Sequence, residues 1–295
     1  MLKQQILGII NLSFPLIIIY TAFPALLALA TGKLIGALLV GAWIWYLSWK
    51  QLNALTQSLQ YSPTGEHKEL YETLIRDCQV DPATVTIRYA YTSETLAMAA
   101  QSTIIIDPVV WNIQDPEAAK VMDIFEQHIK PTLTEPQKAR IAATREALTP
   151  AAERFIFKHE LGHIVRNISQ RKLFSLFVVG ASAAYTALLA ASAVMHISGF
   201  LAVAVGMLVG FVADLAYAMI VNAVWRLQEE KAADRFAAQY SSAEEIEAAA
   251  EFFAQHQEIL DHNPEPNNLF AMFPSELRTG HPNGKTRAAD LMNAK

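Results

Sequence analysis

The stretch FIFKHELGHI, residues 155–164, decides how the rest of the chain is interpreted. It contains the pattern HExxH, with His159 and His163 four residues apart and Glu160 directly after the first histidine. Residues four apart share one face of a helix, so the two imidazoles can offer nitrogen atoms to a single Zn²⁺ ion. Glu160 lies beside them and can take a proton from an attacking water molecule. The stretch predicts a helix with two metal ligands and a general base, and a third ligand has to come from elsewhere.

A candidate third ligand occurs in the stretch WRLQEEKAAD, residues 225–234. A catalytic zinc site holds three protein ligands, and two histidines with one glutamate form a known set. Glu230 and Asp234 are one helical turn apart, so if Glu230 binds the metal, Asp234 can accept a hydrogen bond from the far nitrogen of a ligand histidine. Glu229 is the competing ligand and would point about 100° away around the helix. Without a metal, the same carboxylates would form a solvated helix face.

The composition excludes several classes of protein. Of the 295 residues, 53% are hydrophobic and 17% are charged, and the formal net charge is -5. A disordered chain would be poor in hydrophobic residues and a nucleic-acid-binding domain would be basic, so we expect neither disorder nor a nucleic-acid partner. Ordinary soluble domains are about 25% charged, and the deficit here points to a membrane protein. The single cysteine, Cys78, cannot form an intrachain disulfide.

Hydrophobic residues are concentrated in two blocks. Residues 5–32 and 34–49 contain no Asp, Glu, Lys or Arg, and the second block covers residues 173–225. A helix that spans a lipid bilayer needs about 20 apolar residues, so we expect two spans in each block. Small residues at 180–183, and a glycine pair at 206 and 210, would let the helices of the second block approach closely. A cleaved signal peptide is the alternative for the N-terminus, but the apolar stretch exceeds the usual length of about 7 to 15 residues.

Basic residues predict the orientation in the membrane. The ends of the spans that adjoin the polar segments carry Lys3, Lys50, Arg166, Arg171, Lys172, Arg226 and Lys231, whereas the opposite side has only Lys33. By the positive-inside rule the polar segments face the cytoplasm. We therefore expect a multi-pass protein of the cell inner membrane, or of another cellular membrane. Its expected parts are two spans in 1–49, the first part of a catalytic domain in 50–172, two spans in 173–225 and the second part of that domain in 226–295.

The polar segments predict a mainly helical domain with a small β-sheet. Alternating and β-branched residues predict strands at 84–90 and 102–107. Helical spacing and capping signals predict helices at 67–80, at 116–129, at 135–148 and from Thr149 and Pro150 through residue 170. Ser242 and Glu245 have the spacing of a capping box ahead of another helix. The predicted fold class is an α+β membrane protein with four transmembrane helices.

Together these motifs resemble the HtpX-like and CAAX-prenyl-protease-like membrane zinc metallopeptidases, which are gluzincins. The resemblance rests on the order of spans and motifs and on HELGHI at 159–164, ExxAD at 230–234, and HP at 281–282 followed by Arg287. It implies a zincin-type protease domain with one Zn²⁺ ion per chain, bound by His159, His163 and Glu230. It also implies that His281 and Arg287 lie at the active site, where His281 would stabilise the oxyanion and Arg287 would support the ligands from outside.

An extended substrate could add to an exposed sheet edge as a further strand. We expect the strand at 102–107 to offer this edge, with Ile104, Ile105 and Ile106 as substrate-binding residues. Recognition through backbone groups would be broad, which suits the removal of misfolded membrane proteins. The sequence thus predicts a zinc metalloendopeptidase that acts on protein or peptide substrates in membrane protein quality control.

Other functions stay open at this point. One alternative is a non-catalytic membrane scaffold that binds zinc, and another is a protease that processes prenyl-proteins. An intramembrane protease is disfavoured, because Arg154, Lys158 and Arg166 surround the motif and charges are costly within a bilayer. The oligomeric state is not predicted.

Overall fold

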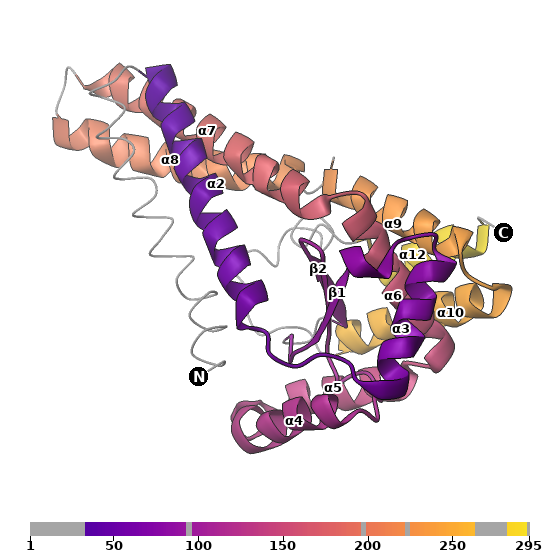
Figure 1. Cartoon of the computed structure of the whole chain (residues 1–295). Coiled ribbons are helices and arrows are strands. Elements are labelled where there is room, and N and C mark those ends of the chain that lie inside the picture. Colours follow the sequence, from indigo (N-terminus) through magenta and orange to yellow (C-terminus); the bar gives the residue numbers. More distant parts are fainter. Residues whose placement is uncertain (1–32, 93–95, 196–198, 222–224, 263–281, 294–295) are drawn as a thin grey trace. The chain divides into compact units, whose positions relative to one another are not determined.

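The computed structural model describes residues 33–92, 96–195, 199–221, 225–262 and 282–293. These residues are mainly helical, with one small sheet (Figure 1). The chain divides into two compact units. Unit 1 comprises residues 1–53 and 170–224, and unit 2 comprises residues 54–169 and 225–295. The boundaries lie within a few residues of those expected for the apolar and polar parts, and the roles of the parts as membrane and catalytic domains stay a prediction.

Three long helices make up the described part of unit 1. They are α2 (Lys33–Ser58), α7 (Ile168–Val194) and α8 (Gly199–Val221), of which α2 and α7 extend by a few residues into unit 2. The helices approach closely at glycines, since a Cβ atom at Gly41 would lie 2.7 Å from the carbonyl oxygen of Phe177. A Cβ at Gly206 would lie 3.1 Å from the Cβ of Ala191. The close packing predicted for α7 and α8 is confirmed at Gly206 and Gly210, which meet Ala187 and Ala191 of α7, whereas Gly180 packs against Ile44 of α2.

Two helices among the described residues are long and apolar enough to cross a membrane. They are α7, with 27 residues, and α8, with 23 residues, and they match the two spans predicted in the second apolar block. The stretch predicted as a short span at 34–49 lies in α2, which continues as a helix through the polar residues 50–58. The span predicted at 5–32, with its alternative as a signal peptide, lies outside the described residues. Four spans therefore stay a prediction.

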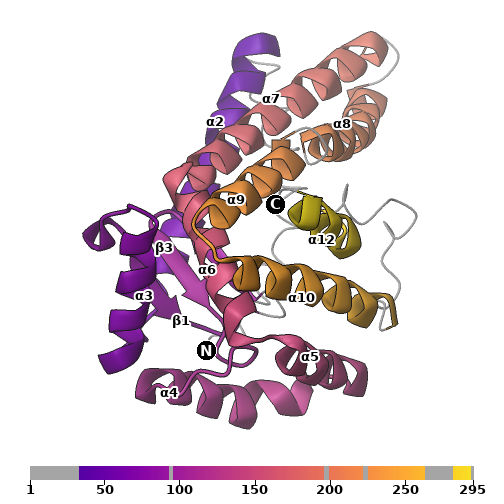
Figure 2. The same cartoon turned by 90° about the vertical axis from the view of Figure 1, so that its right-hand side faces the viewer.

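Unit 2 surrounds one central helix, α6 (Pro150–Val165), with a sheet and further helices (Figure 2). The other elements of this unit are α3 (Gly65–Asp77), η1 (Pro82–Thr84), β1 (Thr86–Tyr89), β2 (Ala97–Ala100), β3 (Thr103–Ile106), α4 (Pro116–Ile124), the π-helical turn η2 (Phe125–Ile129), η3 (Lys130–Thr132), α5 (Glu135–Ala147), α9 (Leu227–Gln239), α10 (Ala243–His262) and α12 (Gly284–Asn293). Helix α6 contacts α3, β2, β3, α9 and α10.

Helix α6 is buried on nearly all sides, which explains why its apolar residues form no single stripe. Phe157 stacks on Tyr71 of α3 with ring centres 5.0 Å apart, and Phe155 meets Phe253 of α10 edge to face at 6.3 Å. Both phenylalanines of α6 are fully buried. A helix that packs on several elements at once is held rigidly, because a core tolerates little change in volume or shape. The HExxH motif therefore lies on a helix that is fixed by packing on several sides.

The sheet has the order β1-β3-β2, with β1 parallel and β2 antiparallel to β3. The strands predicted at 84–90 and 102–107 are confirmed as β1 and β3, whereas β2 was not predicted. The prediction that 102–107 offers an exposed edge is wrong, because β3 is paired on both sides. Ile104, Ile105 and Ile106 are at most 2% exposed and belong to the core. The edges of the described sheet are β1 and β2.

The predicted helices of unit 2 are present with small changes at their ends. Helices α3, α4 with η2, and α5 match the predicted positions, and α10 begins after the predicted capping box, in which Ser242 and Glu245 exchange hydrogen bonds. Helix α6 ends at Val165 rather than at residue 170. Asn167 then adopts a left-handed conformation with φ 53°, which asparagine tolerates better than most residues, and α7 begins at the next residue.

Candidate metal centre

Helix α6 presents the three residues of the motif from one buried face. The helix starts at Pro150 behind Thr149, whose hydroxyl accepts a hydrogen bond from the N–H of Ala152. The rings of His159 and His163 lie nearly perpendicular to each other, with centres 4.6 Å apart. Ligand atoms of these histidines and of Glu160 all lie within 4.8 Å of one another. The predicted cluster of two imidazoles and a carboxylate is therefore formed.

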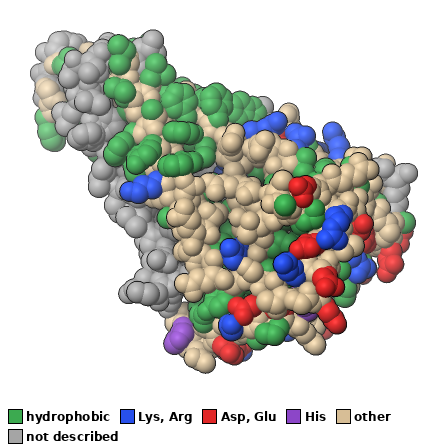
Figure 3. Space-filling model, viewed as in Figure 1, with side chains coloured by type: hydrophobic (Ala, Val, Ile, Leu, Met, Phe, Trp, Pro, Cys, Tyr) green, Lys and Arg blue, Asp and Glu red, His purple; other side chains and the backbone are tan. Residues whose placement is uncertain are grey.

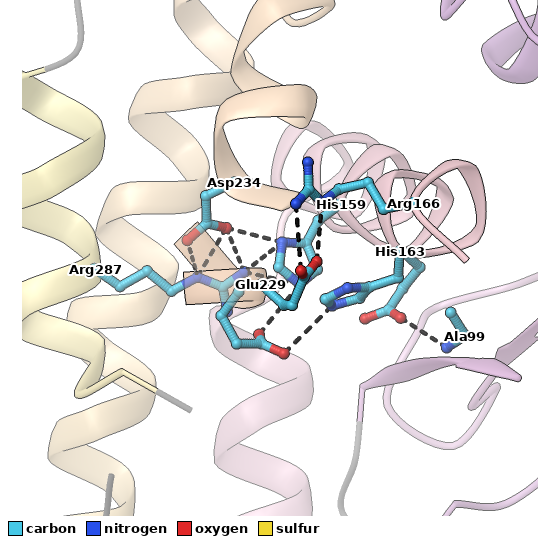
Figure 4. Close-up of polar contacts among 9 residues, drawn as sticks. Ala99, His159, His163, Arg166, Glu229, Asp234 and Arg287 are labelled. Carbon is cyan, nitrogen blue, oxygen red and sulfur yellow. Dashed lines mark hydrogen bonds and ion pairs between the residues drawn. The ribbon is translucent and has the colours of Figure 1, made fainter. Parts of the chain in front are cut away.

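Glu230 reaches the two histidines from helix α9. Its Oε1 lies 3.3 Å from Nε2 of His163, and its Oε2 lies 3.4 Å from Nε2 of His159. Glu229, the competing ligand, forms an ion pair with Arg166 at 2.9 Å instead (Figure 4). Of the two neighbouring glutamates, the structure brings only Glu230 to the motif.

The donor atoms around this point fit a zinc ion. In a tetrahedral site with bonds of about 2.0–2.2 Å, neighbouring ligand atoms lie roughly 3.4 Å apart. The two distances from Glu230 to the histidine nitrogens agree with this spacing. Two imidazole nitrogens and one carboxylate are the protein ligands of a catalytic zinc site, whereas a structural zinc site has four protein ligands.

Asp234 and Arg287 support the site from behind His159 (Figure 4). Oδ1 of Asp234 lies 2.8 Å from Nδ1 of His159, as the one-turn spacing from Glu230 predicted. Arg287 of α12 donates to both oxygens of Asp234, at 2.8 and 3.0 Å from Nε. The guanidinium of Arg287 in turn lies 3.8 Å from the centre of the Phe253 ring. The far nitrogen of His159 is thus held, and Nε2 is directed towards Glu230 and His163.

These charges shift the protonation of both partners. Burial would raise the pKa of the Asp234 carboxyl, but the charges of Arg287 and His159 outweigh burial and lower this pKa to about 2. Burial and Arg287 would lower the pKa of His159, but Asp234 and Glu230 outweigh them and raise it to about 9. A metal ion that binds Nε2 therefore has to displace a proton from His159 near neutral pH.

Glu160, the predicted general base, has a partner that the sequence did not reveal. Oε2 of Glu160 accepts a hydrogen bond of 2.7 Å from the backbone N–H of Ala99, in strand β2 (Figure 4 labels Ala99). The strand that was not predicted thus lies directly beside the HExxH motif. Its sequence, AMAA, offers none of the branched or aromatic residues by which strands are recognised.

A buried ionic cluster was also missed. Nζ of Lys158 donates to Oε2 of Glu245 at 2.7 Å and to the carbonyl oxygen of Tyr240 at 2.8 Å, while Nε of Arg154 donates to Oε1 of Glu245 at 2.9 Å. Lys158 is only 4% exposed, so it belongs to the interior of unit 2. The capping-box spacing of Glu245 was the available signal, but it predicted only a helix start.

The remaining predicted site residues lie elsewhere. Ile104, Ile105 and Ile106 pack in the core, as described above, and His281 lies outside the described residues. The structure therefore brings together His159, Glu160, His163, Glu230, Asp234 and Arg287.

An HExxH helix, a glutamate from a second helix and an outer carboxylate behind the first histidine define a site of the metallopeptidase class. In agreement, residues 137–295 match the family model described as peptidase family M48. The match covers more than half of the chain and includes all six residues of the assembled site, and the chain belongs to peptidase family M48. Comparison with curated proteins and with solved structures gives no match.

Proposed function

We propose that this metallopeptidase is a membrane-anchored zinc endopeptidase that cleaves protein or peptide substrates. The observation that carries the proposal is the convergence of Nε2 of His159, Nε2 of His163 and the carboxylate of Glu230 at the spacing that zinc requires. These three residues would hold one Zn²⁺ ion per chain. When bound, the ion supplies Lewis-acid chemistry that makes water more acidic and polarises a peptide carbonyl.

Residues around the metal site would perform the proton transfers and hold the ligands in position. Glu160, next to the ligands, takes a proton from the attacking water and passes it to the leaving amine. Asp234 fixes the tautomer and orientation of His159, and Arg287 balances the charge of Asp234. We propose that His281 stabilises the developing oxyanion, as the resemblance implies.

We propose that the substrate binds along β2 rather than along β3. β2 is an edge strand that contacts the HExxH helix, and its Ala99 meets Glu160 directly. An extended peptide that adds to this edge would be held mainly through its backbone, and its side chains would matter less. Such recognition accepts many sequences, which suits the clearance of misfolded proteins.

The surface of unit 1 supports the membrane anchorage. Helix α8 exposes large apolar side chains, among them Phe200 at 86%, Leu208 at 65% and Val212 at 56%. Figure 3 shows hydrophobic side chains gathered over the helices of unit 1, whereas most charged side chains lie on unit 2. Apolar side chains on all sides of a helix are typical of contact with lipid. With the positive-inside rule, we propose a cytoplasmic active site at the inner membrane or another cellular membrane, and a role in membrane protein quality control.

The test uses the purified full chain in detergent micelles, with zinc content and casein cleavage as the two measurements. We expect about one zinc per chain and cleavage that a chelator abolishes. Glu160→Gln should keep its zinc and lose cleavage, whereas Glu230→Gln should lose both. Glu229→Gln is the matched control and should retain zinc. Zinc that is unaffected by Glu230→Gln, or cleavage that survives Glu160→Gln, would overturn the proposal, and full zinc binding without any cleavage would favour a scaffold.

A further inference from the structure

The hydrogen bond between Glu160 and Ala99 joins the general base to the strand that would receive the substrate. Oε2 of Glu160 accepts from the N–H of Ala99 at 2.7 Å, and both residues are buried. A bond between an amide and a carboxylate is stronger than one between neutral groups. The carboxylate therefore has a defined resting position on β2.

The pairing of β2 shows which way this N–H points. The carbonyl oxygen of Leu96 accepts from the N–H of Asp107, which places residue 96 in a hydrogen-bonded pair with the central strand. Since hydrogen bonding alternates along an antiparallel pair, residues 98 and 100 face β3, whereas Ala97 and Ala99 direct their N–H groups away from it. The N–H of Ala99 is therefore one of the outward groups with which the edge strand could hold an added strand.

Two acceptors thus compete for one donor. We propose that Glu160 occupies, in the resting enzyme, a backbone position that a substrate strand takes over, so that pairing of the substrate with β2 releases the base for the reaction. This inference rests on the proposed function, because it assumes that Glu160 is the base and β2 the substrate edge. A substrate carbonyl that accepts from Ala99 leaves Oε2 of Glu160 without its partner. The carboxylate then turns to the water that it deprotonates.

The release of Glu160 from Ala99 requires only a local movement of the Glu160 side chain. The carboxylate of Glu160 already lies within 4.8 Å of the ligand nitrogens of both histidines, so side-chain rotation alone brings it to the reacting water. Helix α6 itself stays in place, because its residues Phe157 and Leu161, which lie close to Glu160 in the sequence, are fully buried. The consequence is a requirement for length: a ligand that reaches the metal but not Ala99 binds without releasing the base.

The N–H of Ala99 can be observed by itself. Met98-Ala99 is the only Met-Ala pair in the sequence, so cell-free synthesis with ¹³C-carbonyl methionine and ¹⁵N-alanine gives a single amide signal in a carbonyl-edited NMR experiment. In the zinc-loaded full chain we expect this proton downfield, as for an amide bonded to a carboxylate, and we expect an upfield shift in Glu160→Ala. Equal positions in the two proteins would show that the bond is absent and would overturn the proposal.

Two ligands then test the exchange in the zinc-loaded wild-type protein. Acetohydroxamate binds zinc but is too short to reach the strand, and we expect it to leave the Ala99 signal in place. A phosphinic peptide that extends along β2 should shift the Ala99 signal to a new position. Glu160→Ala with the same peptide should give the Ala99 signal at that same position. An Ala99 signal that the long peptide leaves unmoved would contradict the proposal.

Kinetics with peptides of increasing length provide an independent readout. In the wild type, kcat should rise once the peptide is long enough to pair with Ala99. Ala99→Pro removes the N–H at an outward position, where proline is tolerated in an edge strand, and should abolish this rise in kcat. Ala97→Pro is the matched control: it should raise KM by about fivefold, as for one lost hydrogen bond, and keep the rise in kcat.

The outcomes separate this inference from the proposed function. Zinc content measured for both proline variants shows whether the site is intact. Suppose that cleavage depends on Glu160, but that neither Glu160→Ala nor the long peptide shifts the Ala99 signal. In that case only the inference about Ala99 fails, and the proposed function stands. If Glu160→Gln cleaves as fast as the wild type, the proposed function fails first.

Discussion

The ammonium group of Lys158 donates a 2.7 Å hydrogen bond to Glu245, and both side chains are at most 9% exposed. Lys158 directly precedes His159, and Glu245 also closes the N-terminal cap of α10 through Ser242. The contact therefore ties helix α6, with His159 and His163, to the turn that follows α9. Helix α9 carries Glu230. Arg154 completes the balance of charge on the second oxygen of Glu245.

Removal of one member of this cluster should be costly, because it leaves buried charge without compensation. We expect Glu245→Gln to lower the free energy of unfolding by about 3 kcal/mol. Glu258→Gln is the matched control, since Glu258 forms an ion pair with Lys285 in which both side chains are more than half exposed. Denaturant unfolding followed by circular dichroism gives both values, and equal losses would refute the role of the cluster.

The contact between Asp234 and His159 should set the affinity for zinc. Loss of an outer partner of a metal-binding histidine typically weakens metal affinity by about 10- to 100-fold, and we expect Asp234→Asn to fall in this range. Asp290→Asn changes the same kind of residue in an exposed pair with Lys231 and should leave the affinity unchanged. Titration against a competing zinc chelator measures both, and a normal affinity in Asp234→Asn would show that the hydrogen bond is dispensable.

His256 should make the protein less stable as the pH falls. Burial, together with the charges of Arg140 and Arg287, lowers its pKa to about 4. In the unfolded chain its pKa is about 6.5, so between these values the unfolded state binds a proton that the folded state excludes. The contribution of His256 to stability is therefore complete above about pH 6.5 and is lost as the pH falls towards 4.

The measurement for His256 is a difference between two proteins. We expect His256→Asn to show a smaller loss of unfolding free energy between pH 7 and pH 5 than the wild type. All other ionisable groups are common to both proteins, so their contribution cancels in the comparison. Parallel pH profiles would contradict the assignment.

The close approach of α2 and α7 should make Gly41 sensitive to substitution. A Cβ at this position would lie 2.7 Å from a backbone oxygen, which cannot move without a shift of the helix. We expect Gly41→Ala to destabilise the packed helices by about 1–3 kcal/mol. Gly199→Ala is the control, because a Cβ there would have no neighbour within 4 Å. Thermal unfolding in lipid nanodiscs compares the two, and a harmless Gly41→Ala would contradict the packing.

Elements could be predicted from the sequence where function or burial requires residues of one kind at a regular spacing. HExxH on a helix, the turn from Glu230 to Asp234, the two long apolar helices and the branched strands β1 and β3 all carry such patterns, and the structure contains these elements. The choice between Glu229 and Glu230 needed the resemblance, because spacing alone left both open. The structure shows the reason for the choice, since Arg166 holds Glu229 away from the motif.

The errors arise where tertiary contacts decide. The alanines of β2 have no preference for strands, and the segment is held as a strand by contacts that are remote in sequence, namely pairing with β3 and the hydrogen bond to Glu160. Without β2, the strand with Ile104 to Ile106 was taken for an edge, although its branched residues are typical of the centre of a sheet. Lys158 was used only to argue against a motif inside the bilayer, and its buried ion pair was not predicted because its partner Glu245 lies 87 positions later in the chain.

The order of the elements also has a consequence for biosynthesis. His159 and His163 precede α7 and α8, whereas Glu230 follows them, so the ligand set is divided by both long apolar helices. A ribosome releases the motif helix first, and the growing chain has no complete zinc site until the second apolar helix has been made. Under the proposed membrane topology, the enzyme becomes active only after its insertion into the bilayer is nearly finished. Under the same topology, this order of elements would protect cytoplasmic proteins from a protease that has not yet reached its membrane.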